Sequence, residues 1–112
     1  MRMRTFLSTA ALATSVLAPV VALDAPAQAA SGRTWNRLAQ CESGGRWHIN
    51  THNGYYGGLQ ISLPTWRGHG GRHFAKLPSR ASRAEQIKVA ERIKRSQGWG
   101  AWPTCSARIG KR

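Results

Sequence analysis

One acidic residue, Glu42, is set apart from the other charged side chains of this sequence. The chain has 17 Lys and Arg residues against 4 Asp and Glu residues. Glu42 follows Cys41 and precedes the run Ser43-Gly44-Gly45. A carboxyl group in apolar surroundings has a raised pKa and can donate a proton near neutral pH. Cleavage of a glycosidic bond requires such a donation to the leaving oxygen, so we predict that Glu42 is catalytic.

The other acidic residues suit different roles. Asp24 lies in an N-terminal segment that we expect to be removed. Glu85 and Glu91 lie at the edge of the apolar face of a predicted helix, where they can pair with Lys88 and Arg95. We therefore predict that both glutamates are structural and solvated.

A single carboxyl group restricts the mechanism. Most glycosidases need a second carboxylate as a base or nucleophile. Without one, the nucleophile must be water or a hydroxyl group of the substrate. In lytic transglycosylases the 6-hydroxyl of the sugar attacks and leaves an anhydro-sugar end, while one glutamate serves first as acid and then as base. The sequence leaves open which nucleophile is used.

A helix predicted over residues 35–43 would position Glu42. Thr34 is the expected N-cap of this helix. One face of the helix carries Trp35, Leu38, Ala39 and Glu42. Gly44-Gly45 is expected to end the helix and to leave open space around the carboxyl group.

The middle of the chain predicts a hairpin and a short helix. Asn53-Gly54 is a hairpin-turn signal. The residues that suit the short strands are Tyr55, Tyr56, Leu59 and Ile61. Ser62 is expected to begin a short helix that contains Trp66.

A longer helix is predicted over about residues 83–97. It opens with a capping box formed by Ser82 and Glu85. Its apolar arc consists of Ile87, Val89, Ala90 and Ile93. Gln97 falls near the middle of this arc, where an apolar side chain is expected and a polar one requires an explanation.

Aromatic residues are frequent, with 5 Trp and 2 Tyr in the chain. Aromatic rings stack on the apolar faces of sugars, but they also fill the cores of small domains. We predict that Trp35 and Trp66 belong to the core because they lie within short helices. Tyr55, Tyr56 and Trp99 are flanked by glycine, and we place them in a groove.

The first residues have the pattern of a secretory signal peptide. Arg2 and Arg4 precede a mostly apolar stretch, and Ala27-Gln28-Ala29 is a small-x-small cleavage signal. A transmembrane anchor is the alternative, but polar residues interrupt the stretch and no basic cluster follows it directly. We expect residues 1–29 to be the signal peptide, residues 30–106 the catalytic domain and residues 107–112 a basic tail.

Cys41 and Cys105 are the only cysteines of the chain. Export would place them in an oxidising compartment, which favours a disulfide, and the alternative is two free buried thiols. A bridge would close about 64 residues and contribute ~4 kcal/mol in the chain-entropy model. The histidines lie in Gly-rich loops without a matching cysteine pair, so we predict no metal site and no cofactor.

The charge of the exported part is strongly positive. Without Arg2, Arg4 and Asp24, 15 basic and 3 acidic residues remain, a net charge of +12. Such a charge attracts nucleic acid or an anionic cell envelope, or it serves only solubility. Because export argues against nucleic acid, we expect anionic cell-wall polymers to be the partner.

Four segments, taken in order, resemble a known family. They are Trp35 to Gly45, Asn53 to Gln60, Thr65-Trp66, and Gln97 to Cys105 with its Trp-Gly-Ala-Trp-Pro core. This order is similar to that of the resuscitation-promoting factor domain of actinobacteria, a transglycosylase-like relative of lysozyme. The resemblance covers about residues 34–106.

The resemblance implies a compact lysozyme-like α+β fold, mostly helical, with a small hairpin and one disulfide between Cys41 and Cys105. It implies that Glu42 is the catalytic glutamate for the β-1,4 bond between N-acetylmuramic acid and N-acetylglucosamine. Gln60, Thr65 and Gln97 match positions that hydrogen-bond the substrate or support the site. The position of Gln97 on an apolar arc is then explained, because that end of the helix would face the groove.

Two positions depart from the family pattern. Position 36 is often acidic in the family and is Asn36 here. Arg46 stands where a small polar residue is common, close to Glu42 in sequence. If Arg46 points inward, it favours the ionised carboxylate and weakens the acid; if it points outward, it only adds positive surface charge.

The leading hypothesis is a secreted, cell-wall-associated and monomeric enzyme that cleaves peptidoglycan glycan strands. The resemblance implicates it in wall remodelling and in resuscitation from dormancy, and leaves room for a partner peptidoglycan hydrolase. One alternative is a peptidoglycan-binding or signalling module with negligible turnover, suggested by the single carboxylate and by Arg46. A cationic antimicrobial or nucleic-acid binder is a further alternative, suggested by charge alone.

Overall fold

The computed structural model describes residues 29–112. The predicted signal peptide falls on residues 1–28, outside the described residues, apart from its last residue. Residues 31–112 form one compact unit. Within the described part of the chain, no helix is long and apolar enough to cross a membrane.

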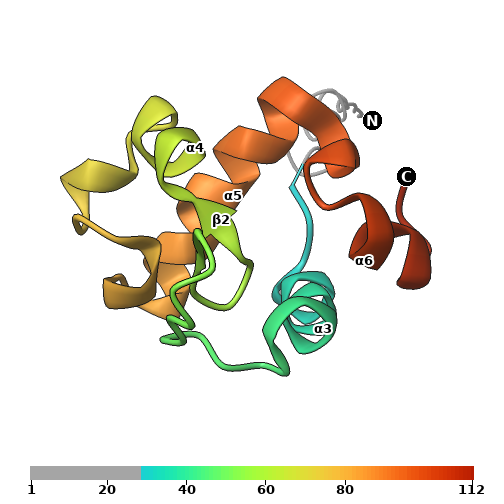
Figure 1. The fold of residues 1–112 in the computed structure, drawn as a ribbon. Coiled ribbons are helices and arrows are strands. Elements are labelled where there is room, and N and C mark those ends of the chain that lie inside the picture. The colour runs from blue at the N-terminus through green and yellow to red at the C-terminus, as the bar shows by residue number, and fades with distance from the viewer. Residues whose placement is uncertain (1–28) are drawn as a thin grey trace, which may run out of the picture. The chain divides into compact units, whose positions relative to one another are not determined.

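The described residues form a mostly helical unit with one small antiparallel sheet (Figure 1). In chain order the elements are α3 (Gly32–Ser43), β1 (Tyr55–Tyr56), β2 (Ile61–Ser62), α4 (Leu63–Gly68), η2 (Gly71–His73), η3 (Pro78–Arg80), α5 (Arg83–Gln97), η4 (Gly98–Ala101) and α6 (Pro103–Arg108). A disulfide joins Cys41 to Cys105. The predicted α+β class, mostly helical with a hairpin and one disulfide, is confirmed and is consistent with a lysozyme-like domain.

Helix α3 begins earlier than predicted and ends where predicted. Its N-cap is Ser31, whose hydroxyl accepts a hydrogen bond of 3.1 Å from the amide of Thr34. The prediction of Thr34 as N-cap was therefore wrong, because Ser31 is an equally good cap three residues upstream. At the other end Gly44 adopts a left-handed conformation (φ 70°), and its amide donates to the carbonyl of Gln40.

The hairpin is present, but its turn lies elsewhere. β1 and β2 pair antiparallel, with Tyr55 opposite Ser62 and Tyr56 opposite Ile61, so the turn is formed by residues 57–60. The predicted turn signal Asn53-Gly54 does not form this β1–β2 turn. These residues lie in the loop before β1, between Asn50 and Tyr56, which form an isolated bridge.

Buried glutamine Gln86 explains the position of the hairpin turn. Its side-chain oxygen accepts a hydrogen bond of 3.0 Å from the amide of Gly58, while its nitrogen donates to the carbonyls of Trp47 (2.7 Å) and Ala81 (3.0 Å). Gly58 also packs against the indole of Trp47, with no room for a Cβ. Because these contacts come from distant parts of the chain, no local turn signal could indicate them.

Helices α4 and α5 have the predicted starts. Ser62 caps α4, and Ser82 and Glu85 form both hydrogen bonds of a capping box at α5. The buried face of α5 contains Val89, Ala90 and Ile93, and Ile87 is half-buried.

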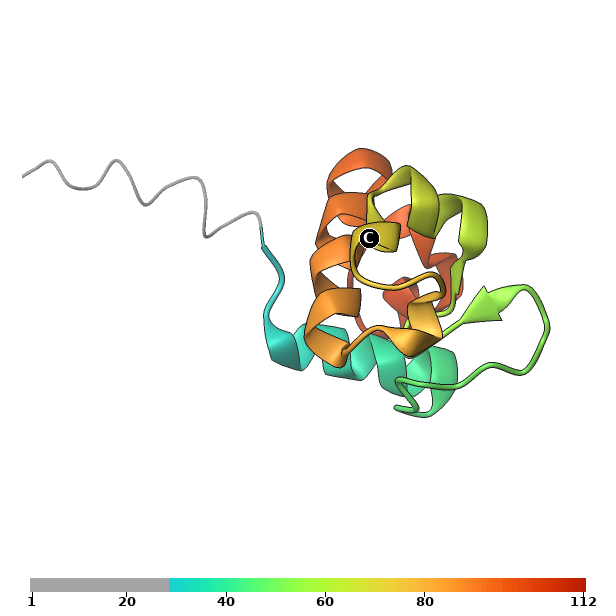
Figure 2. The same cartoon turned by 90° about the vertical axis from the view of Figure 1, so that its left-hand side faces the viewer.

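Helix α3 passes the first turns of α5 (Figure 2), and the core gathers side chains from α3, α4, α5 and the hairpin. Its largest fully buried side chains include Trp35 and Leu38 from α3, Trp66 from α4, and Val89 and Ile93 from α5. The prediction that Trp35 and Trp66 are core residues is confirmed.

Glu91 differs from its predicted role. One oxygen accepts a hydrogen bond of 2.8 Å from the indole nitrogen of Trp35, and the other lies 3.4 Å from the ammonium of Lys94. Only 14% of the Glu91 side chain is exposed. The predicted solvated pairing with Arg95 was wrong, because α3 brings an indole donor to this edge of α5.

The disulfide connects α3 to α6, with the two Cα atoms 5.7 Å apart. It closes a loop with a sequence separation of 64, which corresponds to ~4 kcal/mol in the chain-entropy model. The predicted basic tail begins inside α6, and the amide of Lys111 donates to the carbonyl of Ser106 at 2.8 Å.

Candidate active site

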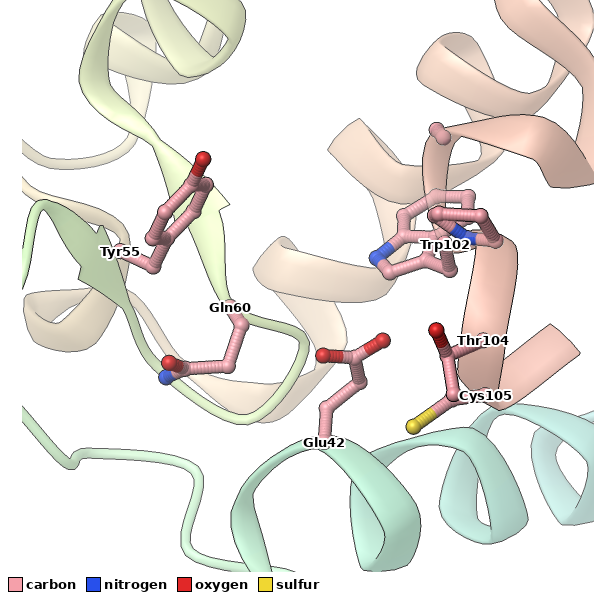
Figure 3. A pocket seen from close by; sticks show the side chains of 8 residues that line it. Glu42, Tyr55, Gln60, Trp102, Thr104 and Cys105 are labelled. Atoms are coloured by element: carbon pink, nitrogen blue, oxygen red, sulfur yellow. The ribbon is translucent and has the colours of Figure 1, made fainter.

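Glu42 occupies the last turn of α3, and its carboxyl group points away from the helix into a hollow (Figure 3). The hairpin with Gln60 lies on one side of the carboxyl group, and Trp102 and Thr104 lie on the other (Figure 3). The position follows from the helix face predicted by sequence. Trp35 and Leu38 anchor that face in the core, so the next position along the face emerges where the core ends.

Arg46 holds the end of α3 and points outward. Its Nε donates a hydrogen bond of 2.7 Å to the carbonyl of Ser43, and its side chain is exposed. A cation at a helix C-terminus interacts favourably with the last carbonyl groups. Within residues 29–112 no ion pair joins Arg46 to Glu42. The structure therefore supports the second alternative for Arg46, in which its side chain points outward and only adds positive surface charge.

Burial raises the pKa of the Glu42 carboxyl above its ordinary value of 4.5. Desolvation is the cause, because partial burial disfavours the charged form. Among the described residues no hydrogen-bond donor or cation offsets this effect. The protonated carboxyl group therefore persists to higher pH than in a solvated glutamate, as a general acid requires.

A groove runs from Glu42 along the hairpin. A hollow of about 340 Å³ is lined by Glu42, Tyr55, Gln60, Ala101, Trp102, Pro103, Thr104 and Cys105. A narrower one of about 70 Å³ continues from it and shares Tyr55, Gln60, Ala101 and Trp102. Thr65 and Gln97 are among the further residues that line this narrower part.

The structure thus brings most of the predicted site residues together. Glu42, Gln60, Thr65, Gln97 and Tyr55 all line this groove, although they come from five segments. Among residues 29–112, Tyr55 is the exposed large apolar residue, with 51% of its surface accessible. A ring in this position can stack on a sugar.

Two predicted groove residues lie outside these hollows. Tyr56 pairs with Ile61 in the sheet. The ring of Trp99 lies 5.3 Å from that of Trp35 and 5.4 Å from the ammonium of Lys94. Trp99 therefore packs against Trp35 of α3 and Lys94 of α5 and does not line either hollow.

Trp102 and Thr104 line the groove although they were absent from the predicted site residues. Trp102 is nearly buried, and its indole nitrogen donates to the carbonyl of Leu59 at 2.9 Å, which ties the two walls together. The Trp-Gly-Ala-Trp-Pro segment was the available signal, since it lies next to Cys105 and thus, through the disulfide, near Glu42. No local signal indicated Thr104.

Gln60 has an unusual backbone for a residue with a side chain. Its φ is 51°, in the left-handed region, and its Nε2 donates to the carbonyl of Gly57 at 3.0 Å. Such conformations cost free energy and occur at functional sites more often than elsewhere. The turn thereby holds Gln60 at the edge of the groove.

His69 joins the two walls of the narrower part. Its Nδ1 lies 2.8 Å from the carbonyl oxygen of Thr65, and its Nε2 lies 2.7 Å from the hydroxyl of Ser96. Ser96 directly precedes Gln97. The end of α5 and the body of α4 are therefore linked at the point where Thr65 and Gln97 enter the groove.

The groove contains one carboxyl group, that of Glu42. In residues 29–112 no group of three or more His, Cys, Asp or Glu side chains could hold a metal ion. The arrangement can donate and accept a proton at one point beside an open, partly aromatic surface.

Residues 29–105 match the family described as a transglycosylase-like domain. This chain belongs to the transglycosylase-like family. The resemblance to resuscitation-promoting factors, predicted from the four segments, is confirmed. Similar proteins include resuscitation-promoting factor Rpf1 of Corynebacterium glutamicum, which is 60% identical over 84 residues, 75% of this chain and 44% of the relative.

Two further relatives agree with this membership. Resuscitation-promoting factor Rpf of Micrococcus luteus is 55% identical over 93 residues, which is 83% of this chain and 40% of that protein. Resuscitation-promoting factor RpfE of Mycobacterium tuberculosis is 50% identical over 97 residues, which is 87% of this chain and 55% of that protein. The chain spans less than half the length of the first two relatives.

Proposed function

We propose that this protein is a muralytic enzyme of the bacterial cell wall that cleaves the glycan strands of peptidoglycan. The proposal rests above all on the half-buried carboxyl group of Glu42, whose raised pKa suits a general acid and which opens into a groove. Membership of the transglycosylase-like family supports the same class of activity.

In the proposed reaction Glu42 protonates the oxygen that leaves the β-1,4 bond between N-acetylmuramic acid and N-acetylglucosamine. The C1–O bond breaks, and the bonding electron pair goes to the leaving oxygen. The resulting carboxylate then accepts the proton of the attacking hydroxyl group. The catalytic carboxyl is thereby protonated again and ready for another cycle.

The residues that line the groove include no second carboxylate, which leaves water or the substrate's own 6-hydroxyl as the nucleophile. Nucleophilic or base catalysis by a second carboxylate needs that group to lie close to the first. Glu85 caps helix α5, and Glu91 is held by Trp35 and Lys94, so neither is available. Because the family is transglycosylase-like, we propose attack by the 6-hydroxyl and an anhydro-sugar product, with water attack as the competing outcome.

The remaining groove residues would bind the glycan. Gln60, Thr65 and Gln97 supply hydrogen-bonding groups along the groove, and Tyr55 offers an exposed ring for stacking. We add Thr104 and Trp102 to this set, because they flank the carboxyl group (Figure 3). Tyr56 and Trp99 would act indirectly, through the sheet and the aromatic cluster.

The cellular setting is also part of the proposal. We infer that residues 1–29 direct export, that the catalytic domain spans residues 30–106, and that the protein acts as a monomer at the cell wall. The names of its relatives point to a role in resuscitation from dormancy, in which wall cleavage, alone or with a partner hydrolase, would permit regrowth.

Mass spectrometry of the soluble products from purified peptidoglycan tests this function. Wild type and Glu42→Gln, both with the disulfide intact, would be compared. We expect anhydro-muropeptides from the wild type and a loss of at least about a hundredfold in the variant, the range typical of removing a general acid. Reducing-end products would indicate water as the nucleophile. Equal product release by both proteins would refute the proposal.

The single carboxylate also leaves a second candidate, a glycan-binding module with negligible turnover. It predicts no products from either protein and saturable glycan binding that survives Glu42→Gln. The same preparations decide this by sedimentation with insoluble peptidoglycan.

A further inference from the structure

A stretch of this chain between two glutamates is free of acidic residues. No Asp or Glu occurs between Glu42 and Glu85. Within this stretch, residues 67–80 form the end of α4 with η2 and η3, and we call them the basic lobe. Its basic side chains are Arg67, Arg72, Lys76 and Arg80, all exposed.

Several cations of the domain have side-chain partners within residues 29–112, and the four of the basic lobe have none there. Arg92 donates to the carbonyl of His69 and lies over the ring of Phe74. Arg83 donates to Asn36 and lies over the ring of Trp47. In the described part of the chain, no hydrogen bond or ion pair engages the four side chains of the basic lobe.

The basic lobe contains a hollow of its own. Lys76, Leu77 and Arg80 line a space of about 380 Å³. None of these residues lines the groove of Glu42. The lobe, drawn in yellow, lies well away from α6 in Figure 1 and faces the viewer in Figure 2. A ligand could therefore occupy it while glycan fills the groove.

We propose that the basic lobe binds a phosphodiester-linked sugar or polyol polymer of the cell envelope, with Lys76 and Arg80 as its central contacts. The Arg80 guanidinium matches a phosphate group in shape and charge, and the ammonium of Lys76 adds a point charge on the same hollow. Leu77 offers an aliphatic surface for the uncharged unit between phosphates. The site is separate from the proposed active site and does not depend on Glu42.

Two other polyanions fit the lobe less well. Single-stranded nucleic acids are held by aromatic side chains on which bases stack. The hollow is lined by aliphatic and basic residues only, and Tyr55, the exposed large apolar residue of the described part of the chain, belongs to the groove. Anionic membranes bind helices that insert an apolar face, and the helical pieces of the lobe are single short turns.

The test is a binding titration with poly(glycerol phosphate) at several salt concentrations. We expect Lys76→Gln/Arg80→Gln to weaken binding about tenfold at low salt and to reduce its salt dependence, because two phosphate contacts are lost. The matched control is Arg33→Gln/Arg37→Gln, which removes the same charge from exposed positions on α3 and should change affinity less than twofold. The altered side chains are all exposed, so both variants should fold.

Other ligands and one other variant complete the test. Polygalacturonate, a single-stranded oligonucleotide and vesicles of phosphatidylglycerol with phosphatidylcholine should bind more weakly and without a specific need for Lys76 and Arg80. Equal losses of affinity in the two double variants would overturn the inference, because binding would then depend on overall charge and not on these two residues. Equally tight binding of any other ligand through these two residues would overturn the polymer class. Glu42→Gln should bind like wild type, and Lys76→Gln/Arg80→Gln should still cleave polymer-free peptidoglycan, which separates this inference from the proposed function.

Discussion

The indole nitrogen of Trp35 donates a hydrogen bond of 2.8 Å to a carboxylate oxygen of Glu91. Trp35 is fully buried, and the carboxylate also lies 3.4 Å from Lys94. This contact joins the helix that carries Glu42 to the longest helix of the domain. It also removes Glu91 from the set of carboxylates that could assist catalysis.

Removal of this acceptor should destabilise the domain. Glu91→Ala leaves the buried indole nitrogen without its partner, and we expect a loss of about 1–3 kcal/mol in the free energy of unfolding. Glu91→Gln keeps an acceptor oxygen and should lose less, mainly the ion pair with Lys94. Urea titrations of both variants measure the difference. An equal loss in the two would mean that charge, and not the hydrogen bond, matters at this position.

Opening the disulfide should affect both stability and the groove. Cys41 precedes Glu42, and Cys105 lines the hollow into which that carboxyl group points. Reduction should lower the free energy of unfolding by ~4 kcal/mol if chain entropy dominates. The Cys41→Ser/Cys105→Ser variant should show the same low stability with and without reductant. Unchanged stability of the wild type on complete reduction would contradict this prediction.

The raised pKa of Glu42 has a defined consequence for activity. Because the acid form is the proton donor, cleavage should decrease as the pH rises through the folded-state pKa of Glu42. NMR titration of the Glu42 side chain gives that pKa independently. A midpoint of the alkaline limb far from the NMR value would assign this limb to another group.

The raised pKa of Glu42 also makes the free energy of unfolding depend on pH. The direction is opposite to that of a salt-bridged carboxylate, whose folded-state pKa is lowered. Above the unfolded-state pKa near 4.5 the folded protein retains a proton that the unfolded chain has lost. Stability from this group is therefore fully present at lower pH and is lost as the pH rises through the folded-state pKa. Glu42→Gln does not titrate, so its stability relative to wild type should increase across this window. Urea titrations at several pH values measure it, and a constant difference would contradict the assigned burial.

The contacts of the hairpin turn predict that substitutions of Gln86 and Gly58, which lie outside the groove, destabilise the fold. Gln86→Leu leaves the amide of Gly58 and two carbonyls without partners, and should cost about 2–4 kcal/mol. Gly58→Ala brings a Cβ into the Trp47 ring and should cost about 1–3 kcal/mol.

The controls for these two changes lie in open positions. Gln40→Leu is on the exposed side of α3, and Gly68→Ala has no atom within 4 Å of the added Cβ. Thermal unfolding of the four variants compares them directly. If Gly58→Ala were no more harmful than Gly68→Ala, the close packing of the turn on Trp47 would not be a constraint.

Sequence reasoning was most successful where the decisive contacts are local. The capping box of Ser82 and Glu85 predicted the start of α5, and Gly44 predicted the end of α3, because such bonds join residues within about one turn. The prediction failed at the start of the first helix, where two caps compete. At the hairpin, Asn53-Gly54 lies in the loop closed by the Asn50–Tyr56 bridge, and the β1–β2 turn held by the buried side chain of Gln86 had no local signal.

For the site, the sequence by itself determined the identity of the groove glutamate, the only two cysteines that could pair, and the helix face that directs Glu42 outward. Each depends on residue type and helical spacing alone. The tertiary structure decided the rest: the burial that raises the pKa of Glu42, the withdrawal of Glu91 by Trp35, and the wall that Trp102 forms. The physical reason is that desolvation and side-chain pairing depend on neighbours that only the folded chain brings close.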